Sequence, residues 1–157
     1  MLMFLMRDGK ADTVVEQFDM LTGLLGLEEF RKIFPVILTD NGSEFKHTRD
    51  LETTEDGKKR TKVFYCDPQA SWQKPQIEKN HEFIRYVLPK GKTLNPYTQE
   101  DITVLMNNIN SIRRESLGGI SPYEATTDKS ILRLMELMGL HTVPADEVNL
   151  TPTLLKR

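Results

Sequence analysis

Pro35-Val-Ile-Leu-Thr-Asp40, followed by Asn41-Gly42-Ser43-Glu44-Phe45, is the stretch that decides how this sequence is interpreted. A short apolar run ends in a threonine and a carboxylate, and a glycine then permits a turn. This order is typical of a central strand whose carboxyl end delivers Asp40 and Asn41 into a loop. Ligands of open α/β sheets bind beyond the carboxyl ends of strands, so Asp40 is a candidate functional residue. A plain Asp-Asn-Gly turn is the other interpretation, with about even odds.

The flanking segments indicate an α/β layer. Residues Ala11 to Leu25 carry a helical apolar stripe that Gly26 closes, and Thr61 to Cys66 forms a second strand candidate after an Asp56-Gly57 turn. The opening Met1 to Met6 has no polar alternate positions and predicts a fully buried strand. Such a strand needs neighbours on both sides, so we expect the chain to start within a larger fold.

The second half of the sequence is predicted to be helical. A helix over Pro75 to Leu88 is expected to bury Ile77, His81, Ile84 and Leu88. Three further helix starts are indicated by capping patterns, and the last residues predict a tail or docking strap. These starts are Thr98 with Asp101, Ser121-Pro122 with Glu124, and Asp128, whose helix ends at Gly139; the tail runs from His141 to Arg157.

Composition favours an ordinary globular protein. The chain has 157 residues, a net charge of −2 and one cysteine, which is enough length for one domain with a hydrophobic core and excludes an internal disulfide. Cys66 is expected to be buried in a strand. No apolar run is long enough to span a membrane, and the first six residues are too short for a secretory signal, so we expect a cytoplasmic protein.

The charge of the whole chain neither requires nor excludes a nucleic-acid partner. Two stretches are mildly basic: Lys46 to Lys62 holds six Lys or Arg against four Asp or Glu, and Ser71 to Lys92 holds five against two. Lys74, Lys79 and Arg85 are therefore candidate phosphate contacts, although a solvated helix face explains such charges equally well.

Glu78, near the start of the predicted helix over Pro75 to Leu88, is the second candidate site residue. A strand-end Asp40 and a helical Glu78 can converge on Mg²⁺ or Mn²⁺, which take oxygen ligands from one or two carboxylates and keep positions open for substrate phosphate. A solvated surface glutamate is the simpler interpretation of Glu78 taken alone. Tyr65 and Trp72 could stack on bases, but aromatic residues near a strand-helix junction more often pack in the core. His81 is not expected to bind a metal, because no second His or Cys stands at a metal-ligand spacing from it.

The order of these pieces resembles a known family. Thr39 to Phe45, then Ser71-Trp72, Glu78, Phe83-Ile-Arg85 and Leu88-Pro-Lys-Gly91, resemble the integrase-type catalytic core of bacterial insertion-sequence transposases of the IS-thirty type. The later Asn107 to Asn110, Arg113-Arg114, Leu117-Gly118 and Ser121 to Ala125 resemble the close of that core. The resemblance covers Met1 to Ala125, which divides the chain into a partial core, 1–127, and a helix and tail, 128–157.

The resemblance implies a ribonuclease H-like fold in which three carboxylates hold two divalent ions that assist DNA strand cleavage and transfer. Asp40 matches the second carboxylate and Glu78 the third, and Asn41, Lys74, Lys79 and Arg85 are the expected DNA contacts. The first carboxylate and the first two strands have no counterpart, and Asp8 lies in the wrong place to supply the missing role. The fold is therefore expected to be incomplete, with extra C-terminal helices.

The resemblance also has departures. Members commonly carry Gly-Thr/Ser-Asn-Glu-Asn around the glutamate, where this chain has Pro75-Gln-Ile-Glu-Lys-Asn80, and the expected amino-terminal helix-turn-helix is absent. We expect a Mg²⁺-dependent or Mn²⁺-dependent transposase fragment that acts on transposon ends and target DNA but is inactive alone. The alternatives are a non-catalytic remnant that associates with itself or with a full-length transposase, and an unrelated α/β domain with chance motifs.

Overall fold

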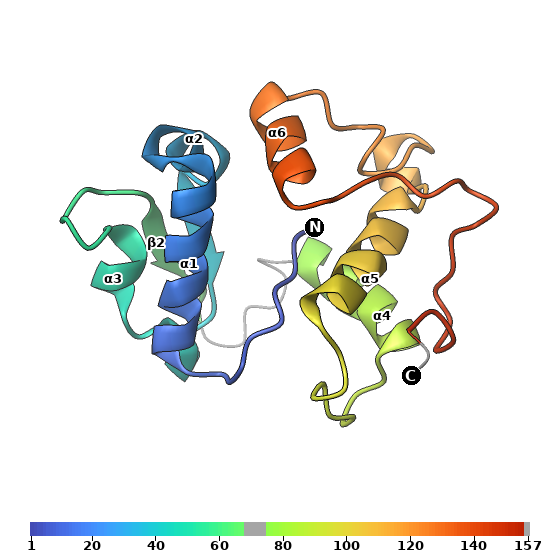
Figure 1. Ribbon diagram of the computed structural model, residues 1–157, viewed down its shortest axis with the longest axis horizontal. Helices are drawn as coiled ribbons and strands as arrows, with labels where there is room; N and C mark the ends of the chain where they lie inside the picture. Colours follow the sequence, from blue (N-terminus) through green and yellow to red (C-terminus); the bar gives the residue numbers. More distant parts are fainter. Residues whose placement is uncertain (68–74, 156–157) are drawn as a thin grey trace. The chain divides into compact units, whose positions relative to one another are not determined.

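The computed structural model describes residues 1–67 and 75–155 (Figure 1). The chain forms two compact units. Met6–Gln73 make one, here named the sheet unit, and Met1–Leu5 together with Lys74–Arg157 make the other, here named the helical unit. Each has its own cluster of buried apolar side chains.

Between residues 6 and 67 the sheet unit has four helical segments and two strands, whose arrangement Figure 1 shows. In chain order they are α1 (Ala11–Leu25), α2 (Leu27–Ile33), β1 (Val36–Thr39), the 3-10 helix η1 (Ser43–Phe45), α3 (Thr48–Glu52) and β2 (Lys62–Tyr65). The strands pair in parallel, from Val36 opposite Lys62 to Thr39 opposite Tyr65. Both strand predictions and the helix closed by Gly26 are confirmed; Gly26 has φ +79° and donates its N–H to the Thr22 carbonyl at 2.8 Å.

One face of the small sheet is covered by α1 and α3. Val14, Leu51 and Val63 are buried together there, with Phe18 and Ile37 packed against them. This alternation follows from the strand period of two, which turns Ile37 and Val63 inward and leaves their neighbours outward. Cys66 is buried, as predicted, immediately after β2.

The opposite face of the sheet exposes apolar side chains. Val36 is 53% exposed, Leu38 42% and Phe64 44%, and the Lys62 ammonium lies 5.2 Å from the centre of the Phe64 ring. Large apolar side chains gathered on one sheet face are unusual unless something covers them.

The buried Arg60 side chain connects α1 and α3 inside the sheet unit. It is only 1% exposed, pairs with Asp19 of α1 at 2.6 Å, and donates to the carbonyls of Leu51 and Asp50 in α3. The guanidinium also lies 5.5 Å from the centre of the Phe18 ring. A buried charge is tolerated only when it is paired and hydrogen-bonded, and Arg60 meets both conditions.

The helical unit is built on a central helix, α5 (Gln99–Ser111), against which α4 (Pro75–Val87) packs (Figure 1). The 3-10 helix η3 (Glu115–Leu117) and α6 (Lys129–Leu137) follow. The predicted capping box is present, because the Thr98 N–H donates to Asp101 Oδ2 at 2.8 Å and the Asp101 N–H donates to Thr98 Oγ1. Leu105, Met106 and Ile109 of α5 are fully buried.

Met1 to Met6 is not a strand, contrary to the sequence-based expectation. Met1 and Leu5 instead bond to side-chain amides of α5, since Asn110 donates to the Met1 carbonyl at 2.8 Å and the Leu5 N–H donates to Gln99 Oε1 at 2.8 Å. Leu2, Met3 and Leu5 pack against the buried cluster. The apolar run is only partly buried, where full burial was expected, and helix amides take the place of a neighbouring strand.

The residues after α6 form a docking strap, which was one of the two alternatives expected for this segment. His141, Val143 and Asn149 donate their backbone N–H groups to Asn107, Ser111 and Asn108 of α5, at 3.1, 2.9 and 2.8 Å. Leu155 is buried in the cluster that contains Leu105.

Ser121 begins a turn, so the helix predicted there is wrong. The Ser121 N–H does bond to the Glu124 carboxylate at 2.7 Å, and Glu124 donates back to Ser121. The capping contacts form, yet only a turn follows. Tyr123 explains the difference, because its N–H is drawn to the Asn110 carbonyl at 3.2 Å and its hydroxyl donates to Asn107.

Helices around a small parallel sheet agree with the predicted α/β class. The described part of the chain holds no helix with the length and apolar character needed to cross a membrane.

Candidate functional site

Asp40 lies where the sequence predicts, one residue beyond the carboxyl end of β1. The Cys66 N–H donates to the Thr39 carbonyl at 2.8 Å, so the strand pairing continues up to the edge that carries Asp40. Asp40 is exposed, and its Oδ1 accepts the Gly42 N–H at 3.3 Å. This bond folds the residues after β1 into an Asx turn, which holds the carboxylate and Asn41 at the sheet edge.

Gly42 leaves space in this turn for the Glu44 carboxylate. A Cβ added to it would lie 2.5 Å from the Oε2 atom of Glu44. The Phe45 N–H donates to the Gly42 carbonyl at 3.1 Å and starts η1. Glu44 therefore folds its carboxylate over the same turn that holds Asp40, and any side chain at position 42 would displace it.

Glu78 lies on α4, in the helical unit, and is exposed. Val87 is the deeply buried residue of this helix, at 3% exposure. Nine residues make two and a half helical turns, so Glu78 faces directly away from Val87. Arg85 follows Glu78 by seven residues, nearly two turns, and is also exposed. The two side chains therefore share the outward face of α4.

His81 is exposed, so the expectation that it packs on the apolar face of α4 is wrong. Phe83, Ile84 and Val87 form the inward face, and Ile77 is 41% exposed. Around the helix Val87 lies between Phe83 and Ile84, while His81 lies beyond Ile84, on the way round to Glu78. His81 lies on the outward side beside Glu78.

The predicted DNA contacts differ in their surroundings. Lys79 is paired with Glu82 at 2.7 Å, and hydrogen bonding to Glu82 raises the pKa of Lys79 while that to Lys79 lowers the pKa of Glu82. Arg85 forms no ion pair with any residue in 1–67 or 75–155. Asn41 is exposed at the sheet edge, and Lys74 lies outside the described residues.

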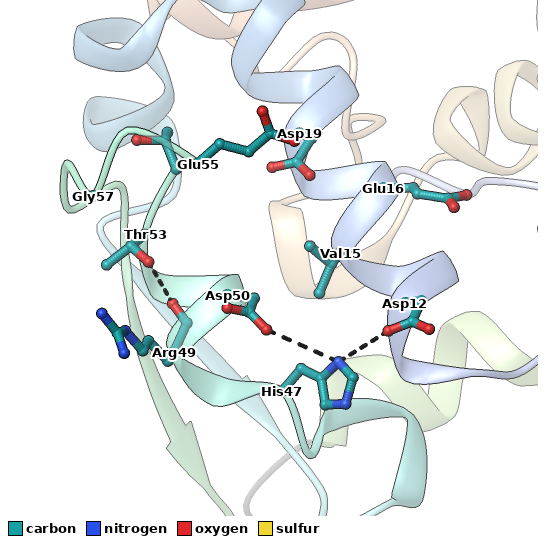
Figure 2. A pocket seen from close by; sticks show the side chains of 11 residues that line it. Asp12, Val15, Glu16, Asp19, His47, Arg49, Asp50, Thr53, Glu55 and Gly57 are labelled. Carbon is teal, nitrogen blue, oxygen red and sulfur yellow. Dashed lines mark hydrogen bonds and ion pairs between the residues drawn. The ribbon is translucent and has the colours of Figure 1, made fainter.

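A pocket of about 410 Å³ lies elsewhere in the sheet unit, between α1 and α3 (Figure 2). His47 sits between two carboxylates, with its Nδ1 atom 3.1 Å from Asp12 and 4.0 Å from Asp50. Glu16, Asp19 and Glu55 add to the acidic wall. Asp40 is not among the lining residues. The residues that the structure describes hold no group of three or more His, Cys, Asp or Glu positioned as a metal site.

Sequence reasoning passed over one feature of the helical unit. Arg114 lies over the Phe83 ring, with the guanidinium carbon 5.4 Å from the ring centre. The Arg113-Arg114 pair was visible in the sequence, but nothing in its spacing indicated that one arginine turns inward onto α4 and the other outward to Glu124.

The chain is similar to transposases and an integrase. It is 31% identical to the transposase of insertion sequence element IS4351 from Bacteroides fragilis over 62% of this chain, and 35% identical to a putative integrase of Spiroplasma virus SpV1-R8A2 B over 56%. Transposase InsI of element IS30A from Escherichia coli K12 is 35% identical over 40% of the chain.

The chain spans 29%, 26% and 16% of the length of these three relatives. No protein-family model matches it, and no solved structure gives a significant match. The resemblance seen in its motifs is confirmed: the chain is a relative of the insertion-sequence transposases, the IS30 type among them, and corresponds to a part of their length.

Proposed function

We propose that this chain is part of a ribonuclease H-like transposase core that cleaves and joins DNA phosphodiesters with divalent metal ions. Asp40 and Glu78 are the metal-binding carboxylates. The observation that carries the proposal is the position of Asp40, an exposed carboxylate in an Asx turn at the carboxyl edge of a parallel sheet, in a chain similar to transposases.

The donor chemistry fits Mg²⁺ or Mn²⁺. Both candidate ligands are exposed carboxylates, the oxygen donors that Mg²⁺ and Mn²⁺ prefer. Bound ions of this kind would stabilise the attacking and leaving oxygens of a phosphodiester during in-line displacement. The Asx turn would orient Asp40, and the outward face of α4 would present Glu78 and Arg85 to the DNA.

Two carboxylates are one fewer than the family resemblance implies. We therefore propose that these 157 residues bind Mn²⁺ or Mg²⁺ weakly and do not cleave DNA without a further carboxylate. Because Mg²⁺ keeps much of its water and is held by one or two carboxylates plus substrate phosphate, DNA should strengthen metal binding.

Calorimetric titration with Mn²⁺ tests the metal site. Asp40→Ala and Glu78→Ala should each abolish the binding heat, while Glu136→Ala, which removes an exposed carboxylate from α6, should leave it unchanged. The acidic pocket is the competing location. If binding survives both site variants but is lost in the Asp12→Asn/Asp50→Asn double variant, the pocket holds the metal and the proposed site is wrong.

Self-association is the second candidate function, and the exposed sheet face favours it. Val36, Leu38 and Phe64 form an apolar surface on two strands with no described strand on either outer edge, and such edges recruit other chains. Sedimentation at tens of micromolar should show oligomers that Leu38→Lys disperses and Leu132→Lys, on α6, does not. A stable monomer would contradict this function and leave the metal proposal intact.

A further inference from the structure

Arg114 stands in a loop whose backbone is held in place. Its N–H donates to the Ile120 carbonyl at 3.1 Å, and its carbonyl accepts the N–H groups of Leu117 and Gly119, each at 3.0 Å. Gly118 and Gly119 have φ values of +69° and +84°, which residues other than glycine rarely adopt, and they allow the chain to turn back within six residues. The starting point of the Arg114 side chain is therefore fixed.

The Arg114 side chain is a partly buried cation that the helical unit does not neutralise. No residue in 1–67 or 75–155 forms an ion pair with it, and its Nε atom is buried without a hydrogen-bond acceptor among those residues. Desolvation lowers the pKa of Arg114, yet a guanidinium remains charged at neutral pH. A buried donor without an acceptor destabilises a fold, so the Arg114 side chain calls for an acceptor from outside.

The Phe83 ring lies against the Arg114 guanidinium and orients it. The Arg114 guanidinium carbon and the Lys79 ammonium lie 5.4 and 5.3 Å from the centre of the Phe83 ring. Two cations therefore gather at one aromatic ring of α4, within two helical turns of Glu78. Asn80, on the same helix, has a side-chain oxygen that is also buried without a partner among the described residues.

We infer that Arg114, supported by the Phe83 ring, contacts a backbone phosphate of DNA bound along α4. The inference rests on the proposed function, since it takes DNA as the substrate, and it adds a contact outside the carboxylate pair. Arginine suits this task because its planar fork donates two parallel hydrogen bonds to one phosphate. Arg113 makes a matched control, since it is the adjacent residue, is exposed and lies 4.0 Å from Glu124.

Fluorescence anisotropy with a labelled duplex, in EDTA so that metal binding plays no part, tests the contact. Arg114→Gln should weaken binding severalfold and reduce the slope of log affinity against log salt by about 0.9, the value for one phosphate contact on duplex DNA. Arg114→Lys should retain part of the affinity, and Arg113→Gln should stay near the wild type. Equal affinity of Arg114→Gln and the wild type would overturn the inference alone, whereas a wild type that binds no DNA would overturn it together with the proposed function.

A second measurement needs no variant. The Nε–H signal of Arg114 in a nitrogen-15 spectrum of the whole chain should shift and saturate when an oligonucleotide is added. Inorganic phosphate at the same phosphate concentration should move it far less, because only the oligonucleotide is held by α4 as well. A signal that does not move with the oligonucleotide, or that saturates equally with free phosphate, contradicts a DNA contact.

Discussion

Lys79 and Arg85 are both proposed DNA contacts, but they differ in whether an ion pair must break before they can bind a phosphate. Lys79 must first leave Glu82, to which it is paired at 2.7 Å. Arg85 has no such pair among the described residues and shares the outward face of α4 with Glu78. The cost of breaking an existing ion pair therefore separates two cations that look alike in the sequence.

Arg85→Gln should weaken duplex binding more than Lys79→Gln does, because Arg85 gives up no partner when it meets a phosphate. Glu82→Gln should strengthen binding by releasing Lys79. Affinities measured at several salt concentrations would check both, because the salt slope should change by about 0.9 for each phosphate that a variant no longer binds. Equal effects of the two cation variants would contradict this ranking.

The same pair predicts how binding responds to pH. Hydrogen bonding to Lys79 holds the pKa of the Glu82 carboxyl below its ordinary value. A carboxyl with a lowered folded-state pKa keeps its pair above that value and loses it only as the pH falls through it. The gain from Glu82→Gln should therefore be constant from about pH 5 to 8 and shrink in stronger acid, where Glu82 is neutral in the wild type as well.

Asp56 gives a sharper titration. Hydrogen bonds from Lys58 and Thr54 lower the pKa of its carboxyl to about 2, in the predicted turn that Gly57 completes with φ +75°. An NMR titration should place the Asp56 midpoint near 2, and Lys58→Met should move it towards the usual value of about 4. A wild-type midpoint at that usual value would mean that the turn does not hold these contacts in solution.

At the level of elements, the side-chain amides of α5 form hydrogen bonds with the backbone of segments that are neither helix nor strand. Asn107 shows this most clearly: at 2% exposure, its Oδ1 accepts both the Tyr123 hydroxyl and the His141 N–H, at 2.8 and 3.1 Å. Asn108 Oδ1 accepts the Asn149 N–H in the same way, and the Asn110 side-chain NH2 donates to the Met1 carbonyl. The helix thereby meets the backbone hydrogen-bonding requirement of segments that form neither helix nor sheet.

Asn107→Ala should lower the free energy of unfolding by about 1–3 kcal/mol for each buried donor it leaves unpaired. Val104→Ala, at an exposed position of the same helix, should change it by less than about 0.5 kcal/mol. Chemical denaturation measures both. A near-neutral Asn107→Ala would mean that water replaces the amide and that the strap is not anchored there.

The elements also show which parts of the fold can be predicted from sequence patterns. The helices capped by Thr98 and Asp128, the strands β1 and β2 and the Asp40 turn depend on local signals, namely apolar periodicity, caps and glycines, and these were predicted correctly. Met1 to Met6 was not, because an apolar run indicates burial without specifying a strand or a side-chain ladder as the partner of its backbone. His81 was misplaced for a related reason. Two apolar stripes of α4 share Ile84, and packing against α5 selects the stripe with Phe83 and Val87 over the one with His81.

In the molecule as a whole, stability is divided between two cores. Arg60 ties α1, α3 and the start of β2 in the sheet unit, while Asn107 ties the strap to α5 in the helical unit. Of the candidate site residues, Asp40 and Asn41 belong to the first unit, and Glu78, Lys79 and Arg85 to the second.

Arg60→Met should therefore destabilise the sheet unit selectively, since its removal leaves Asp19 and two α3 carbonyls without their buried partner. Hydrogen exchange should speed up in α1 and β2 while α5 stays protected, and Asn107→Ala should produce the reverse pattern. Uniform acceleration in both variants would show that the two cores unfold as one cooperative unit instead.

The burial of Arg60 also lowers the positive charge on the surface of the sheet unit. The stretch from Lys46 to Lys62 holds two more cations than carboxylates in the sequence, yet one of those cations is sealed inside the sheet unit and committed to Asp19. Lys58 is held by Asp56, and the nearby pocket wall is acidic. A segment that is basic by its sequence is thus almost neutral at its surface, and it would attract a polyanion only weakly.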